Sequence, residues 1–269
     1  MTALGVPAVG RPPRPRSSLV APFGVLGFLA VTWLALSEEF GIGLDLGALI
    51  EDIARGKGIL SELLDPNWAF IPNTVRPMLE TIQMAILGSA IGCALALPVS
   101  FLASRVTSPN RAVFVLDRSV LSVVRAIPDI LYALLLVAAV GVGPLPGVLA
   151  LTLFNIGVVA KLLSETVDGI DQGPIEAARA GGANRTQTVR WAVMPQVLPN
   201  YVAYSLYTFE LNIRASTVIG IVGAGGIGNT LFGQYRFFNW SNVSVIVIEL
   251  FALVFLIEVL SISLRRRLV

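Results

Sequence analysis

The sequence predicts an all-α integral membrane protein with six transmembrane helices. Of its 269 residues, 55% are hydrophobic and only 13% are charged, whereas an average soluble domain is about 25% charged. The mean hydropathy is +0.79, so the chain carries more apolar surface than a soluble fold can bury. Lipid must therefore surround much of the chain, and helices satisfy their own backbone hydrogen bonds in that solvent.

Six apolar stretches carry this prediction, because each is close to the roughly 20 residues of helix that cross a bilayer. The first follows a basic tail and precedes no small-x-small cleavage site, so we expect a retained span rather than a signal peptide. The third is interrupted by Arg125, Pro128 and Asp129. The predicted spans are residues 19–36, 78–104, 119–142, 148–164, 201–222 and 243–264.

The polar segments define the rest of the predicted organisation. Residues 37–74 are acidic on balance and are expected outside the membrane, with a short amphipathic helix near residues 46–54. The predicted parts are a basic tail at 1–18, a first transmembrane helix at 19–36, an extracytoplasmic segment at 37–74, and a five-helix core at 75–269 with a polar loop at 165–195.

The distribution of arginine predicts the orientation of the chain. Six spans place both termini on one side of the membrane. Most arginines, including those within residues 11–16 and 265–267, fall on that side, whereas few basic residues, such as Arg55 and Arg236, fall on the other. The positive-inside rule therefore predicts cytoplasmic termini and a cytoplasmic 165–195 loop, with the acidic segment outside.

The composition also excludes several classes of function. Cys93 is the single cysteine, which excludes an internal disulfide framework and a cysteine-based metal cluster. The chain has no histidine, so a Ser-His triad, a His-ligated zinc and an imidazole base are excluded as well. The net charge of +2 gives no reason to expect nucleic-acid binding.

One glycine motif suggests a cofactor site at first sight. Gly223, Gly225 and Gly228 have the G-x-G-x-x-G spacing of dinucleotide-binding enzymes, and Glu249 follows about 20 residues later. However, the motif lies at the end of the fifth span, and the apolar run that follows is too long for a strand. We therefore expect these glycines, with Gly226, to form a flexible re-entrant turn or a close helix contact.

The 165–195 loop is the most informative segment. Pro174 suits the first turn of a helix, Glu176 complements the positive helix start, and Gly181 and Gly182 interrupt the helix. A second short helix over residues 184–191 is expected to end before Pro195. On physical grounds alone, a solvated surface hairpin is an equally good interpretation.

Three features of this loop occur together: Glu176-Ala177-Ala178, then Gly182, then Met194-Pro195. In this arrangement it resembles the EAA loop of the permease subunits of bacterial ABC importers, although Ala192 stands where a larger aliphatic residue is common and Met194 where leucine is usual. In that family the loop is a coupling helix that sits in a cleft of the ATP-binding subunit. The resemblance implies that the ATPase contacts are Glu176, Ala177, Ala178, Gly182, Asn184 and Arg185.

The resemblance extends over roughly residues 75–269, and two further segments narrow it to a smaller group of permeases. The segments "VVRAIPDILYALLLV" (123–137) and "LYTFELNIRASTVIGIVGAGGIG" (206–228) are similar to permeases of phosphonate importers, whose relatives serve phosphite and phosphate. Methionine-type permeases share "STVIGIVGAGGIG" but not the arginine of "LNIRAST".

This resemblance implies a type I ABC importer permease fold in the bacterial inner membrane. It implies a homodimer with the path on its two-fold axis, two ATP-binding subunits and an extracytoplasmic solute-binding protein, besides the surrounding membrane lipid. Nothing in the chain resembles G-x-x-x-x-G-K-[ST]. We therefore expect ATP and Mg on the partner ATPase, no cofactor on this chain and no nucleic acid.

Polar residues inside the predicted spans mark the expected substrate path, because an ionised group there costs at least a few kcal/mol unless it is paired or faces water. Arg214 is the sharpest candidate, since a guanidinium fork matches a tetrahedral oxyanion, and Ser216 and Thr217 would add hydroxyl donors. The candidates are Arg125, Asp129, Glu210, Asn212, Arg214, Ser216 and Thr217.

Ion pairs are the structural alternatives for four of these residues. Glu210 and Arg214 lie four residues apart, so an internal ion pair explains them as well as a substrate site does. Arg125 and Asp129 are also four apart and flank Pro128, and for them a structural pair at a kink is the favoured interpretation.

Three rival functions stay open. A permease for methionine or another small solute would share most of the motifs. A secondary transporter would need an ion-coupling site and usually an internal repeat, which the sequence does not show. A membrane-embedded enzyme would need a water-facing cluster of catalytic side chains, and the acids do not form an obvious one.

Overall fold

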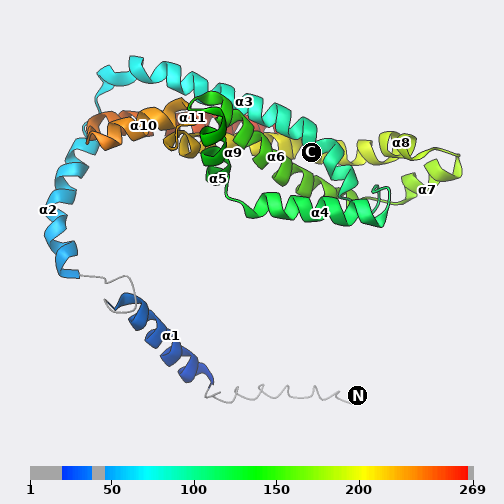
Figure 1. The fold of residues 1–269 in the computed structure, drawn as a ribbon, viewed down its shortest axis with the longest axis horizontal. Coiled ribbons are helices and arrows are strands. Elements are labelled where there is room, and N and C mark those ends of the chain that lie inside the picture. The colour runs from blue at the N-terminus through cyan, green and yellow to red at the C-terminus, as the bar shows by residue number, and fades with distance from the viewer. Residues whose placement is uncertain (1–19, 38–45, 266–269) are drawn as a thin grey trace, which may run out of the picture. The chain divides into compact units, whose positions relative to one another are not determined.

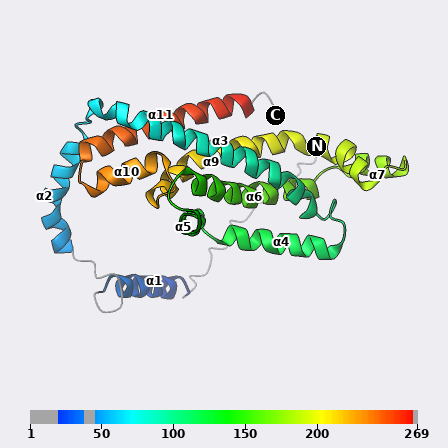
Figure 2. The same cartoon turned by 45° about the horizontal axis from the view of Figure 1, so that its top comes forward.

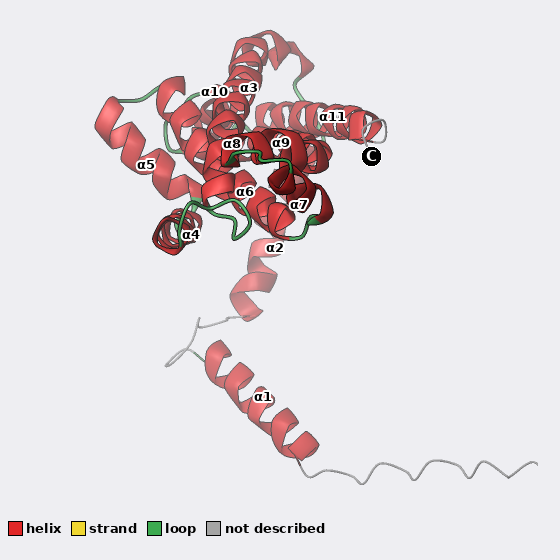
Figure 3. Cartoon of the chain, turned by 90° about the vertical axis from the view of Figure 1, so that its right-hand side faces the viewer, coloured by secondary structure: helices red, strands yellow, loops and turns green. Residues whose placement is uncertain are grey.

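The computed structural model describes residues 20–37 and 46–265, which are almost entirely helical, and it places no strand in these ranges (Figure 3). The chain forms two compact units, residues 1–58 and 59–269, and α2 (Leu46–Leu63) crosses their boundary. The predicted tail at 1–18 and part of the acidic segment lie outside the described residues. In the first unit, α1 (Val20–Leu36) matches the predicted first span.

The second unit is a bundle of helices around three long ones. In Figures 1 and 2, α3, α6 and α9 run side by side, and each contacts the other two. The helices of this unit are α3 (Ile71–Leu102), α4 (Arg111–Ala126), α5 (Asp129–Val140), α6 (Pro144–Asp168), α7 (Gly173–Ala180), α8 (Arg185–Thr188), α9 (Met194–Ile221), α10 (Gly226–Arg236) and α11 (Trp240–Arg265), with a short 3-10 turn at Trp68–Phe70.

Within residues 20–37 and 46–265, three continuous helical segments are long and apolar enough to cross a membrane: Trp68–Leu102, Pro144–Asp168 and Trp240–Arg265. Two bent helix pairs bring the total to five if each pair counts as one span. The helix of the first unit is shorter, with an apolar stretch at Pro22–Leu36. The count of six spans therefore stays a prediction.

The predicted third span, residues 119–142, is interrupted as the sequence indicated, and the break is sharper than a kink within one helix. The span is replaced by α4 and α5, which meet at 87°. Figure 2 shows α5 almost end-on and α4 lengthwise. The cause is local: Ile127 is extended (ψ 122°) and Pro128 then caps α5 without a backbone donor.

Small residues let the central helices pack closely. A Cβ atom added to Gly88 would lie 2.7 Å from the Cβ of Leu151, and one added to Gly92 would lie 2.5 Å from the Cβ of Asn155. The amide of Asn155 donates to the carbonyl of Gly88 at 3.0 Å. Close backbone approach and interhelical hydrogen bonds are the forces that hold helices together in lipid, where burial of apolar surface contributes little.

The residues of the glycine motif form a turn and a tight helix contact. Gly223, Gly225 and Gly226 have φ of 93°, 82° and 71°, a region that L side chains rarely adopt. The turn joins α9 to α10, which are bent by 44°. A Cβ atom on Gly228 would overlap the backbone of Thr217 on α9.

We expect Gly228→Ala to destabilise the protein by about 1–3 kcal/mol, because backbone atoms rather than a flexible side chain must move. The measurement is thermal unfolding of the solubilised complex. Gly233→Ala is the matched control, since Gly233 lies in the same helix with nothing within 4 Å of the added carbon. Equal unfolding temperatures for the two variants would show that the contact is loose.

Candidate functional site

The predicted coupling segment begins with α7, whose sequence explains its position. Pro174 lies in the first turn and Glu176 is the acid of that turn. Ile175 is 1% exposed and packs in one cluster with Leu163, Val167 and neighbours on α9. This buried isoleucine, which is not part of the sequence motif, fixes the helix so that Glu176 and Ala177 remain exposed while Ala178 is half-buried.

A tight turn then reverses the chain. Gly182 has φ +78°, and the N–H of Ala183 donates to the carbonyl of Ala178 at 3.0 Å. Asn184 caps α8 reciprocally with Gln187, through bonds of 2.9 and 2.8 Å. Five of the six predicted coupling residues therefore lie on α7 or in this turn, and Arg185 opens α8.

The predicted end of the second short helix before Pro195 is wrong. The five residues Val189–Val193 form a π-helical segment that connects α8 directly to α9. A π segment accommodates a proline, because the wider turn relieves the clash between the ring and the preceding carbonyls. The coupling segment is thus one turn away from a long central helix, with no flexible linker on that side.

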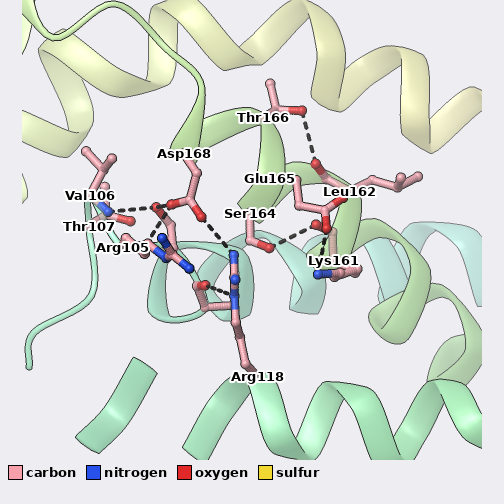
Figure 4. A network of polar contacts seen from close by, with 12 residues as sticks. Arg105, Val106, Thr107, Arg118, Lys161, Leu162, Ser164, Glu165, Thr166 and Asp168 are labelled. Atoms are coloured by element: carbon pink, nitrogen blue, oxygen red, sulfur yellow. Dashed lines mark hydrogen bonds and ion pairs between the residues drawn. The ribbon is translucent and has the colours of Figure 1, made fainter. Parts of the chain in front are cut away.

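Asp168 is the centre of a polar network that joins the end of α6 to two other elements (Figure 4). One oxygen of its carboxylate accepts from the Ser104 hydroxyl and the Arg105 N–H, both at 2.7 Å. The other oxygen pairs with Arg118 of α4 at 2.7 Å. Arg118 also donates to the carbonyl of Ala103 at 3.0 Å.

This network reaches the coupling segment. Arg185 donates to the carbonyl of Thr107, and a cavity of about 320 Å³ lies between residues 106–108 and the segment from α7 to the π helix. Arg179 and Arg185 both line this cavity. No local motif marks Asp168, because its side-chain partners lie 50 to 64 residues away in the sequence.

The structure pairs Glu210 with Arg214, as expected, and places two further charged residues beside them. Arg214 lies 2.6 Å from one oxygen of Glu210 and 3.8 Å from Glu258 of α11. Arg265 binds the second oxygen of Glu210 at 3.2 Å. The side chain of Glu210 is only 10% exposed and that of Arg214 is 47% exposed. Two acids and two arginines therefore form a charge-balanced cluster between α9 and α11.

The other polar residues proposed for the substrate path do not all lie on the same surface as Arg214. Ser216 is fully buried and donates back to the carbonyl of Ile213 at 2.8 Å, so it does not line a surface with Arg214. Asn212 is also fully buried and donates to Ser89 of α3 at 2.6 Å. Thr217 lies one helical turn after Arg214 and is partly exposed, although its hydroxyl also donates to the carbonyl of Ile213, at 3.3 Å. Of the three, Thr217 alone shares the face of Arg214.

Arg125 and Asp129 flank the predicted kink but form no ion pair within the described ranges. One carboxylate oxygen of Asp129 accepts from the N–H of Ile130 at 2.9 Å. Both residues line a cavity of about 330 Å³ at the bend, together with Tyr132 and Phe154. The kink is confirmed, whereas the pair that was favoured to hold it is absent.

Comparisons with known proteins agree on one family. The family model described as "Binding-protein-dependent transport system inner membrane component" matches residues 96–269. The chain is 37% identical to the phosphite transport system permease protein PtxC of Stutzerimonas stutzeri over 262 residues, 95% of each chain. It is 38% identical to the phosphate-import permease protein PhnE of Mycolicibacterium smegmatis over 95% of this chain and 48% of that protein.

A solved structure supports the fold independently. The inward-facing MetNI methionine ABC transporter contains a chain that matches 76% of this one, over 99% of its own length, with a TM-score of 0.68 and 24% sequence identity. At that level of identity the likeness establishes the architecture and carries no information about the solute.

Proposed function

The chain belongs to the family of binding-protein-dependent transport system inner membrane components, and on that premise we propose that it is the permease subunit of an ATP-driven importer of phosphorus oxyanions. The observation that carries the proposal is the 37% identity to a phosphite permease over 95% of both chains. A methionine or other small-solute importer is the alternative, and its support is a shared fold at 24% identity.

The energy for transport comes from other subunits in this proposal. The chain has no G-x-x-x-x-G-K-[ST] motif, so ATP and Mg are bound by two partner ATPase subunits, and an extracytoplasmic binding protein delivers the solute. The exposed face of α7, with Glu176 and Ala177, and the turn at Gly182 contact the ATPase. A homodimer places the substrate path on a two-fold axis, and both termini are cytoplasmic.

The proposed recognition element of the path is Arg214. Its guanidinium is half exposed and is held in one orientation by Glu210, whose charge is shared with Arg265. An oxyanion that approaches the exposed side of Arg214 meets a donor fork and the nearby Thr217 hydroxyl. Glu210 then serves to position the arginine, so the ion pair and the anion site are compatible rather than exclusive.

The proposal is tested by ATP-dependent uptake of labelled phosphite into vesicles that hold this chain, its ATPase and its binding protein. Phosphate, phosphonate and methionine are added as competitors. We expect competition by the phosphorus oxyanions and none by methionine. Competition by methionine instead would retain the permease assignment and refute the oxyanion substrate. Uptake that persists without ATP and follows an ion gradient would favour a secondary transporter.

A further inference from the structure

Helix α4 presents two different surfaces to the outside of the bundle. Three arginines, at 111, 118 and 125, recur every seven residues, so they lie along one side of the helix at intervals of about 10 Å. Ser122 lies among them, and Ser119 lies at the border of the same side. The neighbouring surface is apolar, and its members Leu116, Val120 and Val123 are 67%, 51% and 63% exposed.

Three separate depressions lie against the arginine side of α4. At the bend, Arg125 lines the cavity of about 330 Å³ described above. In the middle of the helix, a shallow, open depression of about 460 Å³ is lined by Arg118, Ser119 and Ser122 together with Phe114 and Val115. At the start of α4, Arg105 and Arg111 line a third, of about 530 Å³, with Ser108 and Asn110.

The charge along this row is positive. Arg118 is neutralised by Asp168, but Arg111 and Arg125 form no ion pair within residues 46–265. Asp129 lines the cavity at the bend and is the acid that faces Arg125 there. No acid lines the other two cavities.

Hydrocarbon cannot cover Arg125, which lies within the predicted third span, because an exposed charge in a span is stable only where it faces water or a partner group. Arg111 and Arg118 precede that span. The apolar surface of Leu116, Val120 and Val123 suits lipid, whereas the arginine and serine side suits water. Unpaired arginines along a water-filled surface attract anions. We infer that this side of α4 lines the inner part of the transport path and that Arg125 and Arg111 carry the phosphorus oxyanion past the bend toward the coupling end.

This inference rests on the proposed function for the identity of the anion, and it adds a second group of binding residues remote from Arg214 in the sequence. The route runs from the cavity at the bend to the cavity beside residues 105–111. Arg118 holds α4 to Asp168, and the serines supply hydroxyl groups beside it.

Neighbouring residues on α4 provide a matched test. In a Cys93→Ala background, single cysteines replace Ser119, Val120, Ser122 or Val123 in the assembled, transport-competent complex in vesicles. Each is treated with a membrane-impermeant anionic methanethiosulfonate reagent and with a cationic one. We expect Ser119→Cys and Ser122→Cys to react at least about 10-fold faster than Val120→Cys and Val123→Cys, because only the serine side meets water and its field concentrates anions.

Two additional measurements define the role of the arginines. Arg111→Gln and Arg125→Gln should lower the ratio of anionic to cationic reaction rates at Ser122→Cys, and phosphite should slow the anionic reaction. Equal reactivity of the serine and valine positions, or a charge ratio unaffected by both arginine variants, would overturn the inference. The uptake assay tests the proposed substrate separately. If phosphite is not transported but another transported anion protects Ser122→Cys from the reagent, the path along α4 is retained and only the proposed substrate is refuted.

Discussion

Replacing Arg214 with alanine is expected to reduce uptake at low substrate concentration by roughly 10- to 100-fold, the equivalent of losing a charge-assisted hydrogen bond worth about 1.5–3 kcal/mol. The complex should still assemble, since Glu210 keeps Arg265 as a partner at 3.2 Å. The measurement is uptake of labelled phosphite, with co-purification of the ATPase as the check on assembly.

A second variant separates an anion ligand from a structural ion pair. Glu210→Gln removes the charge that pairs with Arg214 but leaves the guanidinium in place. If Arg214 binds the oxyanion, Glu210→Gln retains much more uptake than Arg214→Ala. If the pair only joins α9 to α11, the two variants lose uptake and thermal stability to the same extent. Normal uptake by Arg214→Ala would remove Arg214 from the path altogether.

The second large effect is expected at the coupling segment. Glu176→Trp places a bulky side chain on the exposed face of α7, and Gly182→Val forces a β-branched residue into φ +78°, which costs about 1–3 kcal/mol and distorts the turn. Both changes should weaken docking of the ATPase. The readouts are co-purification of the ATPase and ATP hydrolysis stimulated by the loaded binding protein.

The adjacent glycine supplies the control for that experiment. Gly181 has φ −75°, and the nearest atoms to an added Cβ are 3.5 Å away, so Gly181→Ala should leave docking unchanged. Glu176→Trp and Gly182→Val complexes that co-purify and hydrolyse ATP like the unmodified one would place the ATPase contact elsewhere.

The sequence predicted those features that depend on local pattern. Apolar runs located the long helices, and glycine spacing located the turn after α9, because both follow from what neighbouring residues allow. The direction of single side chains was less predictable. Ser216 is two residues from Arg214 in the sequence but points into the bundle, since a helix turns by about 200° over two residues.

Features that depend on distant partners were not visible in the sequence. From the sequence alone, Asp168 is a solvated acid just after a predicted span. Only the fold brings Ser104 and Arg118 into contact with it. Arg125 and Asp129 have the spacing of a helical pair, yet the bend places them on two different helices and removes that geometry. The proline before Asp129 was the available signal, and it indicates a break more strongly than a pair.

The polar network of Asp168 also determines which parts of the molecule are tied to the start of the coupling segment. Asp168 ends α6 just before α7 and holds the loop after α3 and the middle of α4. The residues that lead into α7 are therefore bonded to α4 and to the loop that follows α3. Beyond the 87° bend, α5 is connected to α4 by the Tyr132 hydroxyl on the carbonyl of Val124 at 2.7 Å. Ile127 and Pro128 thus separate the part of this segment that Asp168 holds, which is α4, from α5, which packs beside α6 and α9.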